Sequence, residues 1–533
     1  MKTIFTAAIT ILVSFSTFAT TVWNGQVSNE WNNASNWSAG VPDATSDAVI
    51  ASTAANNVYV SGSASCRNIE IAQGGVIEVG NGETLNVYGD IVNNGAFDAA
   101  SGKVNFAGVS HISDYMNFND ITISGTLYAP STSIEVKGDW YNNGVFINGM
   151  GNVQFSGQSS IGGNAITSFY NVYVSGELTS HAVAINVKGN FLNNGTFHHN
   201  GGTVVMNGSS NQSVGIGSVT EFYNLAVSNP NYGVCMTSDI TITNKLSLMS
   251  GYLNIFTYVL TIANNDPSAV ERMNGYVISE TIAASGYSFM KWVIGRGKGT
   301  YVYPFATNGN HDYVPVTVEI SESGVGTDGS LAIATYATDD ANNSYPTGVT
   351  GVNDSTGADI SAQAVNRFWI SQVAGYAVAP VSAISFTASE VEIGVNDSLI
   401  ASKWNGQAWI SASNSQQHID NGTRVNDMSD YSIFMLVDEY GVDAPVVISG
   451  VESTREEQVK IYPTAISSND EIHVKGIAGS AVMQVIDMQG RVVMSQQVDN
   501  NASVSMSDMA SGMYFAQVIS QGQMHSERIV VAR

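Results

Sequence analysis

Side chains that could act as acids or bases are scattered along this chain of 533 residues, and no spacing joins them into a catalytic set. Hydrolysis of a glycosidic bond needs two carboxylates held a few ångströms apart, and the sequence by itself does not pair its candidates. Neither an H-E-x-x-H nor a G-x-S-x-G motif occurs, and no Cys–His signature is present. We therefore assign no catalytic, cofactor-binding or metal-ligating residue. The candidate carboxylates are Asp43, Asp47, Asp139, Asp339 and Asp340.

Two lysines occupy equivalent positions of a repeated segment that is described below. Lys137 stands two residues before Asp139, and Lys188 stands two residues before Asn190. Stacked on one face of a β-helix, they would give the basic and acidic face on which lyases cleave acidic polysaccharides. Tyr88 breaks the lysine row in another copy of the segment. Solvated face residues are therefore the favoured interpretation.

Two further patterns suggest metal ligands. The loop 339–343 reads D-D-A-N-N and could bind calcium through clustered oxygens, although an Asn- and Asp-rich loop without a metal is the simpler interpretation. His198 and His199 lie in an expected turn, where solvation is favoured over metal binding. We predict no cofactor, with calcium as the possible exception.

The two cysteines, Cys66 and Cys235, lie far apart in the sequence and have no clustered histidines beside them. A thiolate metal site is therefore not expected. Two small apolar side chains are favoured over a disulfide, which an exported protein would permit.

The composition favours strands and turns over helices. Charged residues make up 12% of the chain, and the 52 glycines are accompanied by many asparagines and β-branched residues. The net charge of -25 argues against nucleic acid or an anionic membrane as a partner. No segment after the N-terminus is apolar for the roughly 18 residues that a transmembrane helix needs.

An internal repeat occupies the first half of the chain. Three segments, 87–97, 136–146 and 187–197, begin at closely similar intervals, and each contains Asn-Asn-Gly. Each is followed at a fixed offset by one strand pattern, and then by a second pattern that begins with F-N-D or F-Y-N. The repeat corners are Asn93, Asn94, Gly95, Asn142, Asn143, Gly144, Asn193, Asn194 and Gly195.

Short strands that alternate apolar and polar residues predict a solenoid of parallel β-coils. We expect each repeat to form two coils of roughly 25 residues, so that residues 45–265 give eight or nine coils and a rod of about 40 Å. Asn-Asn-Gly should supply left-handed backbone at the corners. Equivalent asparagines on stacked coils should form amide ladders. A β-propeller, whose blades also run to 40–50 residues, is the less supported alternative.

The segment 23–50 has three tryptophans followed by D-A-V-I. Its W…N-W-x-x-G-x-P…D-x-V-x-I order resembles the opening of bacterial surface proteins that contain right-handed β-helices. We expect Trp23, Trp31 and Trp37 to cap the solenoid, in preference to forming a platform for sugars. The predicted β-helix domain with its cap covers residues 20–268.

From about residue 269 the repeat stops, and short strands alternate with Gly, Pro and Asn-Gly turns. The stretch 403–410 is typical of a hairpin with Asn-Gly at its turn. We predict an antiparallel β-sandwich over residues 269–446.

Both ends of the chain carry export signals. Residues 1–19 combine Lys2, an apolar stretch and small residues, as in a cleaved signal peptide. Residues 459–533, after a linker at 447–458, contain D-x-x-G-R at 487–491, G-x-Y at 512–514 and a basic-apolar tail from 528. On these motifs the segment resembles the type A C-terminal sorting domain of the type IX secretion system of Bacteroidetes. One departure is Thr464-Ala465, where that family usually has Asn-Pro. The residues that match the family's motifs are Asp487, Gly490, Arg491, Gly512, Tyr514 and Arg528.

These features predict a signal-bearing, all-β protein that is exported by the type IX machinery and is secreted or held at the outer-membrane cell surface. It should consist of a right-handed parallel β-helix, an antiparallel β-sandwich and a small sorting β-sandwich. We expect an adhesin or structural surface component that binds glycans or other cells. The alternative is a polysaccharide lyase or glycoside hydrolase with a β-helix catalytic domain. A row of Asp, Arg and Lys across adjacent coils would favour that alternative.

Overall fold

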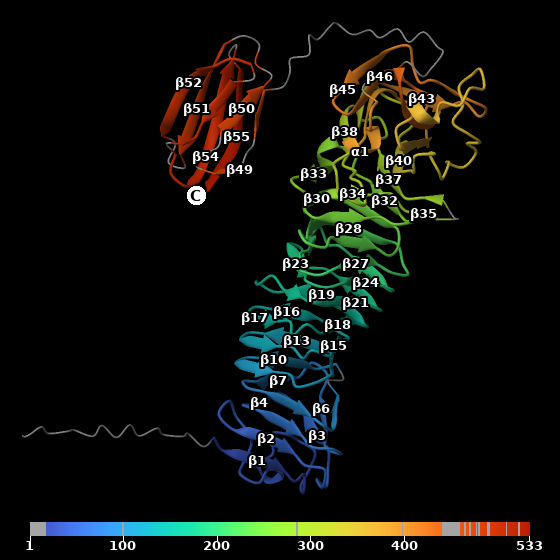
Figure 1. The fold of residues 1–533 in the computed structure, drawn as a ribbon. Helices are drawn as coiled ribbons and strands as arrows, with labels where there is room; N and C mark the ends of the chain where they lie inside the picture. Colours follow the sequence, from blue (N-terminus) through green and yellow to red (C-terminus); the bar gives the residue numbers. More distant parts are fainter. Residues whose placement is uncertain are drawn as a thin grey trace, which may run out of the picture. The chain divides into compact units, whose positions relative to one another are not determined.

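The computed structural model describes residues 18–98, 101–283, 286–396, 398–439, 459–462, 465–467, 471–475, 477, 480–487, 491–500, 502–507, 509–520 and 523–532. The chain divides into two compact units, Met1–Ile448 and Ser449–Arg533 (Figure 1). Strands dominate both, so the predicted all-β class is confirmed. The predicted linker and all but the last two residues of the predicted signal peptide lie outside the described residues. Within the described ranges, every helix is too short or too polar to cross a membrane.

The larger unit begins as a parallel β-solenoid of about 11 turns. Each coil has three strands, which give the solenoid three faces, and each strand pairs with the strand at the same position of the next coil. We call the first face A. Its strands are β1 (Thr20–Trp23), β2 (Asp47–Ile50), β5 (Ile69–Ile71), β8 (Ile91–Asn93), β11 (Val109–His111), β14 (Thr126–Tyr128), β17 (Val145–Ile147), β20 (Ser168–Phe169), β23 (Ala184–Val187) and β26 (Thr203–Met206).

Faces B and C follow face A along each coil. Face B contains β3 (Val58–Val60), β6 (Val76–Val79), β9 (Ala96–Asp98), β12 (Met116–Phe118), β15 (Ser133–Val136), β18 (Asn152–Phe155), β21 (Asn171–Val174), β24 (Phe191–Asn193), β27 (Gln212–Gly215), β29 (Val234–Met236), β31 (Tyr252–Asn254) and β34 (Tyr276–Ile278). Face C contains β4 (Ser63–Cys66), β7 (Thr84–Val87), β10 (Lys103–Phe106), β13 (Asp120–Ile123), β16 (Trp140–Asn142), β19 (Gln158–Gly162), β22 (Glu177–Thr179) and β25 (Thr196–His198).

The coils are shorter than the sequence led us to expect. In the body of the solenoid, Asn152 pairs with Asn171 on the next coil, and Val172 pairs with Phe191. The three repeat copies contain β8, β16 and β24, so successive copies are eight strands apart. Each coil has three strands. Each repeat therefore holds more than the two coils that we predicted, and that prediction was wrong. Each copy of the repeat consequently begins on a different face.

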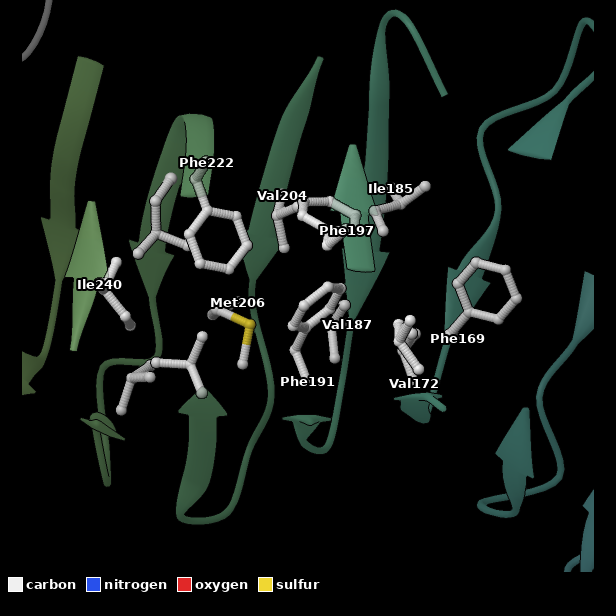
Figure 2. Close-up of a cluster of buried hydrophobic side chains, with 14 of the residues drawn as sticks. Phe169, Val172, Ile185, Val187, Phe191, Phe197, Val204, Met206, Phe222 and Ile240 are labelled. Carbon is white, nitrogen blue, oxygen red and sulfur yellow. The ribbon is translucent and has the colours of Figure 1, made fainter. Parts of the chain in front are cut away.

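The interior is a stack of apolar side chains, because strand residues alternate between buried and exposed positions. Figure 2 shows part of this stack, including Phe191, Met206 and Phe222. The three repeat copies place the same aromatic pair inside the solenoid, although on different faces. The ring centroids of these pairs are 5.5 Å apart for Phe97–Phe118, 5.8 Å for Phe146–Phe169 and 5.6 Å for Phe197–Phe222.

The start of the solenoid is closed by the three tryptophans around the short 3-10 helix η1 (Ala34–Asn36). The exposed fractions of Trp23, Trp31 and Trp37 are 1%, 0% and 4%. Their rings meet edge to face, with centroids 5.0 Å apart for Trp23–Trp37 and 4.8 Å for Trp31–Trp37. These buried rings cap the solenoid and offer no platform for sugars.

The far end continues without a break into antiparallel strands. β28 (Thr220–Ser228) and β30 (Ile240–Ser250) run through the corner between faces C and A, and β32 (Val259–Ile262) pairs in parallel with β37 (Phe289–Val293). β37 then pairs antiparallel with β40 (Ser330–Ala337). One sheet therefore belongs to both the solenoid and the expected sandwich. Short elements at this end are β33 (Val270–Arg272), β35 (Ile282–Ala283), β36 (Gly286–Tyr287), η2 (Pro267–Ala269), η3 (Ser361–Gln363) and α1 (Glu390–Ile393).

Two antiparallel sheets complete this unit and share its core. Phe386 of one sheet lies 5.6 Å from Trp369 and 4.9 Å from Phe434 of the other, between ring centroids. The first sheet adds β41 (Arg367–Ala374), β47 (Ile433–Asp438), β43 (Leu399–Trp404) and β44 (Trp409–Ser411) to β37 and β40. The second contains β38 (Gly299–Tyr303), β39 (Val316–Glu322), β42 (Val381–Thr387), β46 (Gly422–Met428) and β45 (Gln416–Ile419).

The C-terminal unit has two sheets and an apolar core of its own. One sheet contains β48 (Lys460–Tyr462), β50 (Glu471–Lys475) and β53 (Ala502–Ser505). The other contains β49 (Ala465–Ser467), β55 (Gln523–Ala532), β54 (Gly512–Ser520), β51 (Ala481–Asp487) and β52 (Val492–Val498).

Candidate functional site

The Asn-Asn-Gly corners are built in the same way in all three copies. The side-chain Oδ1 of the first Asn accepts a hydrogen bond from the backbone N–H of the Gly two residues later. These bonds measure 3.1 Å at Asn93–Gly95, 3.2 Å at Asn142–Gly144 and 3.1 Å at Asn193–Gly195. None of the nine corner residues, all of which are described, has a positive φ. The predicted left-handed corner backbone was therefore wrong.

Glycine is required at these corners because neighbouring coils approach closely. A Cβ atom on Gly144 would lie 2.0 Å from the carbonyl oxygen of Gly125, and one on Gly195 would lie 2.0 Å from that of Gly176. On Gly95 it would lie 2.4 Å from the carbonyl oxygen of Gly75. Backbone packs against backbone here, so any side chain would push the coils apart.

Equivalent asparagines do not stack, because each copy begins on a different face. Asn93 lies on face A, Asn142 on face C and Asn193 on face B. The predicted ladders through these positions are absent from the described coils. For the same reason Lys137, which follows β15 on face B, and Lys188, which follows β23 on face A, do not form one basic row.

Amide ladders occur within the strands instead. The Nδ2 of Asn105 donates to the Oδ1 of Asn86 at 2.9 Å on face C. On face B the Nδ2 of Asn171 donates to the Oδ1 of Asn152 at 2.9 Å, and the Nδ2 of Asn152 donates to the Oγ of Ser133 at 3.1 Å.

A second kind of side-chain bond joins successive coils. On face C the register places Lys103 beside Asp120, and Asp139 directly precedes the next strand of that face. Asp120 Oδ1 accepts the backbone N–H of Asp139 at 2.8 Å, and Asp139 Oδ1 accepts that of Ser160 at 2.9 Å. In another repeat copy, two asparagines make the corresponding bonds: Asn171 Oδ1 accepts the N–H of Asn190, and Asn190 Oδ1 accepts the N–H of Ser213, both at 2.7 Å. Since an asparagine amide accepts the same backbone hydrogen bond as an aspartate carboxylate, these positions require an acceptor oxygen but no acidic group.

The other sequence candidates are not gathered into a site. Asp43 accepts bonds from Thr45 and Ser46 within its own turn, and Asp47 pairs with Arg67. No group of three or more His, Cys, Asp or Glu residues that could hold a metal ion occurs among the described residues. Both cysteines are free, and burial raises the pKa of Cys66, which is completely enclosed.

The predicted calcium loop is occupied by its own hydrogen bonds. Asp339 Oδ1 accepts the backbone N–H groups of Asn343 and Ala341, which lowers the pKa of Asp339. Asp340 Oδ1 accepts a bond from Asn366. Of the two histidines, His198 lies 3.1 Å from Glu177 and His199 lies 3.4 Å from Glu221, as two separate pairs.

The sequence analysis missed an open groove of about 220 Å³ on face B. Its lining residues come from four successive coils of that face. The residues that line it are Ser133, Asn152, Gln154, Asn171, Val172, Tyr173, Asn190 and Leu192. Asn152, Asn171 and Asn190 recur at an equal interval, which is one coil. This regular spacing was the signal in the sequence that could have revealed the groove.

The groove offers neutral hydrogen-bonding groups and an aromatic ring. None of its lining residues carries a carboxylate, ammonium or guanidinium group. Tyr173 accepts a bond from Nδ2 of Asn194 at 2.8 Å, so its phenol proton remains available. The nearby Glu135 is already bonded by Ser156 and Tyr115, which lower the pKa of its carboxyl.

In the C-terminal unit, the described sorting residues lie at neighbouring strands of one sheet, because the register pairs Asp487 on β51 with Tyr514 on β54, and Arg528 on β55 with Phe515, the residue after Tyr514. Asp487 is buried and accepts bonds from the backbone N–H of Arg491 at 2.9 Å and from its Nε at 2.7 Å. The Arg491 side chain itself is 75% exposed. Gly490 lies outside the described residues. Gly512 begins β54, where Tyr514 is buried and its hydroxyl donates to the Ala510 carbonyl at 2.9 Å, and Arg528 is exposed on β55.

Comparisons with known families agree with this division of the chain. Residues 460–532 match the family described as "Secretion system C-terminal sorting domain". The chain therefore carries a C-terminal sorting domain of the type IX secretion system, which implies export to the cell surface or secretion. Residues 22–123, which include the tryptophan cap, match a "Domain of unknown function (DUF8693)". The comparison with curated proteins gave no match.

One similar solved structure is that of PorZ, an essential bacterial surface component of the type-IX secretion system of Porphyromonas gingivalis. The match has 11% sequence identity and a TM-score of 0.13, and it covers 48% of this chain and 44% of that chain. A TM-score this low does not establish a shared fold.

Proposed function

We propose that this type IX-exported surface protein binds a neutral polysaccharide in the groove on face B, and acts as an adhesin or structural surface component. The observation that carries the proposal is the uncharged, amide-lined groove, which the regular Asn spacing builds on a rigid parallel sheet. Its volume is below the roughly 300 Å³ at which drug-sized pockets begin. It therefore suits a sugar ring that lies on the protein surface and is not enclosed in a pocket.

The chemistry of the groove supports a polyhydroxylated ligand. Amides and hydroxyls both donate and accept hydrogen bonds, as sugar hydroxyls do. The Tyr173 ring adds an apolar surface with a polar edge. The net charge of -25 disfavours an acidic polymer, because the protein would repel it. The proposal also includes a cleaved signal peptide at 1–19, which supplies the first export step.

The test is binding of the full chain to an array of neutral and acidic glycans, followed by affinity measurements on the strongest neutral hit. The variants Tyr173→Ala and Asn190→Ala should each weaken binding about tenfold, which corresponds to ~1.4 kcal/mol. Asn86→Ala removes a ladder asparagine on face C and is the matched control, which should bind normally. Binding that survives both groove variants, or a preference for acidic glycans, would refute the proposal.

A carbohydrate-active enzyme remains the second candidate, because Lys103, Asp120 and Asp139 follow one another across adjacent coils, in a row of the kind that favours it. The hydrogen bonds of both carboxylates to the next coil favour a structural role. Incubation of the full chain with the bound glycan distinguishes the two. Cleavage products that disappear in Asp139→Asn would establish the enzyme, and an intact polymer would exclude cleavage of that glycan.

A further inference from the structure

Three aromatic side chains lie together at the last coils of face B. The rings of Tyr252 and Tyr276 are stacked, with centroids 6.3 Å apart and planes 24° apart. His311 lies 5.2 Å from Tyr252 and 5.4 Å from Tyr276. We call these three residues the aromatic platform. His311 is exposed, and both tyrosines are partly exposed.

The backbone of the preceding coil leaves room for the platform. Tyr252 pairs with Tyr276 in the strand register, so the two rings follow the solenoid axis from coil to coil. On the preceding coil, a Cβ atom on Gly233 would lie 2.5 Å from the Tyr252 ring. The absence of a side chain there lets the Tyr252 ring lie against bare backbone.

The platform and the groove belong to one sheet. Three strand steps separate the last groove strand, β24, from β31, which corresponds to about 14 Å at ~4.8 Å per step. From Asn190 the column of paired residues continues through Ser213 and Cys235 to Asn254, none of which is charged. Tyr252 lies two residues before Asn254 on β31, so the platform is displaced from this column by two residues along the strand. A single extended molecule can therefore cover both sites.

We infer that the aromatic platform is a second subsite for the same neutral polysaccharide, whose chain runs along the solenoid axis from the groove to Tyr276. This inference rests on the proposed function and extends it, because it requires a polymer and excludes a mono- or disaccharide as the full ligand. Sugar rings would lie on the tyrosine and histidine faces, as apolar faces of ligands lie on aromatic side chains in binding sites.

The phenol groups fit the same ligand. Burial raises the pKa of Tyr252 and of Tyr276, so both phenols stay protonated and can donate to sugar oxygens. The guanidinium of Arg272 lies 3.8 Å from the ring centroid of Tyr313, so this cation is held against a neighbouring ring beside the platform.

The experiment measures the affinity of the full chain for neutral cello-, malto- and manno-oligosaccharides, from disaccharide to decasaccharide. In the wild type, affinity should rise once the chain is long enough to reach from the groove to the platform. Tyr252→Ala, Tyr276→Ala and Tyr276→Leu should weaken binding of the longest oligosaccharide about 3- to 10-fold, and leave that of the disaccharide unchanged. The leucine variant keeps apolar bulk on the strand, so it separates the loss of stacking from a loss of folding.

The matched control is Tyr128→Ala. Tyr128 is also an exposed tyrosine stacked on a histidine, at 4.4 Å from His111, but it lies on face A. This variant should bind every oligosaccharide normally. Affinity that rises with length but survives all platform variants, or short chains that bind as well as long ones, would overturn the platform and leave the groove intact. Failure of every oligosaccharide to bind the wild type would instead refute the proposed function.

Discussion

The two compact units of this chain are both made of strands, but their contacts differ in kind. In the solenoid, each strand pairs in parallel with the strand at the same position of the next coil, and side-chain amides, carboxylates and bare glycines fit one coil onto the next. In the sorting unit, mostly antiparallel strands enclose a separate small core, and one corner is fixed by Asp487 and Arg491.

The two kinds of contact suit the two units to different functions. A stack of coils buries its apolar faces only against neighbouring coils, so it must be capped and can offer a long outer face for binding. A small separate core can be removed without exposing the core of the rest. We therefore expect the solenoid to supply binding and the C-terminal unit to supply export.

The largest effect should come from deleting residues 459–533. Because that unit has its own core, the remaining chain should fold with an unchanged melting temperature but stay in the periplasm. Cell fractionation and surface protease accessibility measure the second result. A truncated protein that still reached the surface would show that export does not depend on the sorting unit.

Loss of the cap should be the strongest perturbation of the solenoid. Trp31→Ala removes a completely buried ring that packs 4.8 Å from Trp37, and should lower the free energy of unfolding by about 3–5 kcal/mol. Denaturant unfolding measures it. Val27→Ala, which truncates a 63% exposed side chain in the same cap, should have little effect. Equal effects of the two substitutions would contradict a role for the tryptophans in closing the end.

Insertion of one methyl group between coils should come next. Gly195→Ala places a Cβ atom 2.0 Å from the Gly176 carbonyl oxygen, and should cost at least the ~3 kcal/mol of a severe overpacking. Gly309→Ala meets no atom within 4 Å and serves as the control. If both variants unfold at the same denaturant concentration, the close approach of neighbouring coils is not the reason for glycine at the corner.

Removal of one buried corner amide should lower the free energy of unfolding by less than the glycine substitution does. Asn193→Ala deletes the acceptor for Gly195 and the bond from Nδ2 to Thr220 at 3.3 Å, and should lower stability by about 1–3 kcal/mol. The side chain of its neighbour Asn194 is exposed and donates to the Tyr173 hydroxyl. Asn194→Ala should therefore shift the unfolding midpoint far less. A larger effect of Asn194→Ala than of Asn193→Ala would show that the exposed Asn194 amide stabilises the corner.

The smallest effect is expected in the sorting unit. The Arg491 side chain is 75% exposed, so its ion pair with Asp487 should contribute less than about 1 kcal/mol. Arg491→Ala should leave the melting of both units nearly unchanged. If the same substitution blocks surface delivery, the export machinery recognises the exposed guanidinium group. Normal delivery would show that the Asp487–Arg491 pair has only a structural role in its turn.

Local patterns in the sequence were sufficient to predict much of this molecule. The period-two alternation predicted strands, the repeat predicted a solenoid, and the aromatic opening predicted a cap, because each depends on residues that are close in the chain. The sorting domain was predicted from Asp487, Arg491 and Tyr514, which lie in short motifs. These features needed no knowledge of how the coils are stacked.

The tertiary structure decided which residues share a face. The length of a coil is set by how strands pair, and the length of the repeat does not reveal that it contains two and two-thirds coils. This fraction turned Asn93, Asn142 and Asn193 onto three different faces, and separated Lys137 from Lys188. It also brought Asn152, Asn171 and Asn190 together into a groove and placed Tyr252 beside Tyr276. The sequence determined the strands and the export signal, whereas the pairing register, a property of the packed backbone, determined the candidate binding surface.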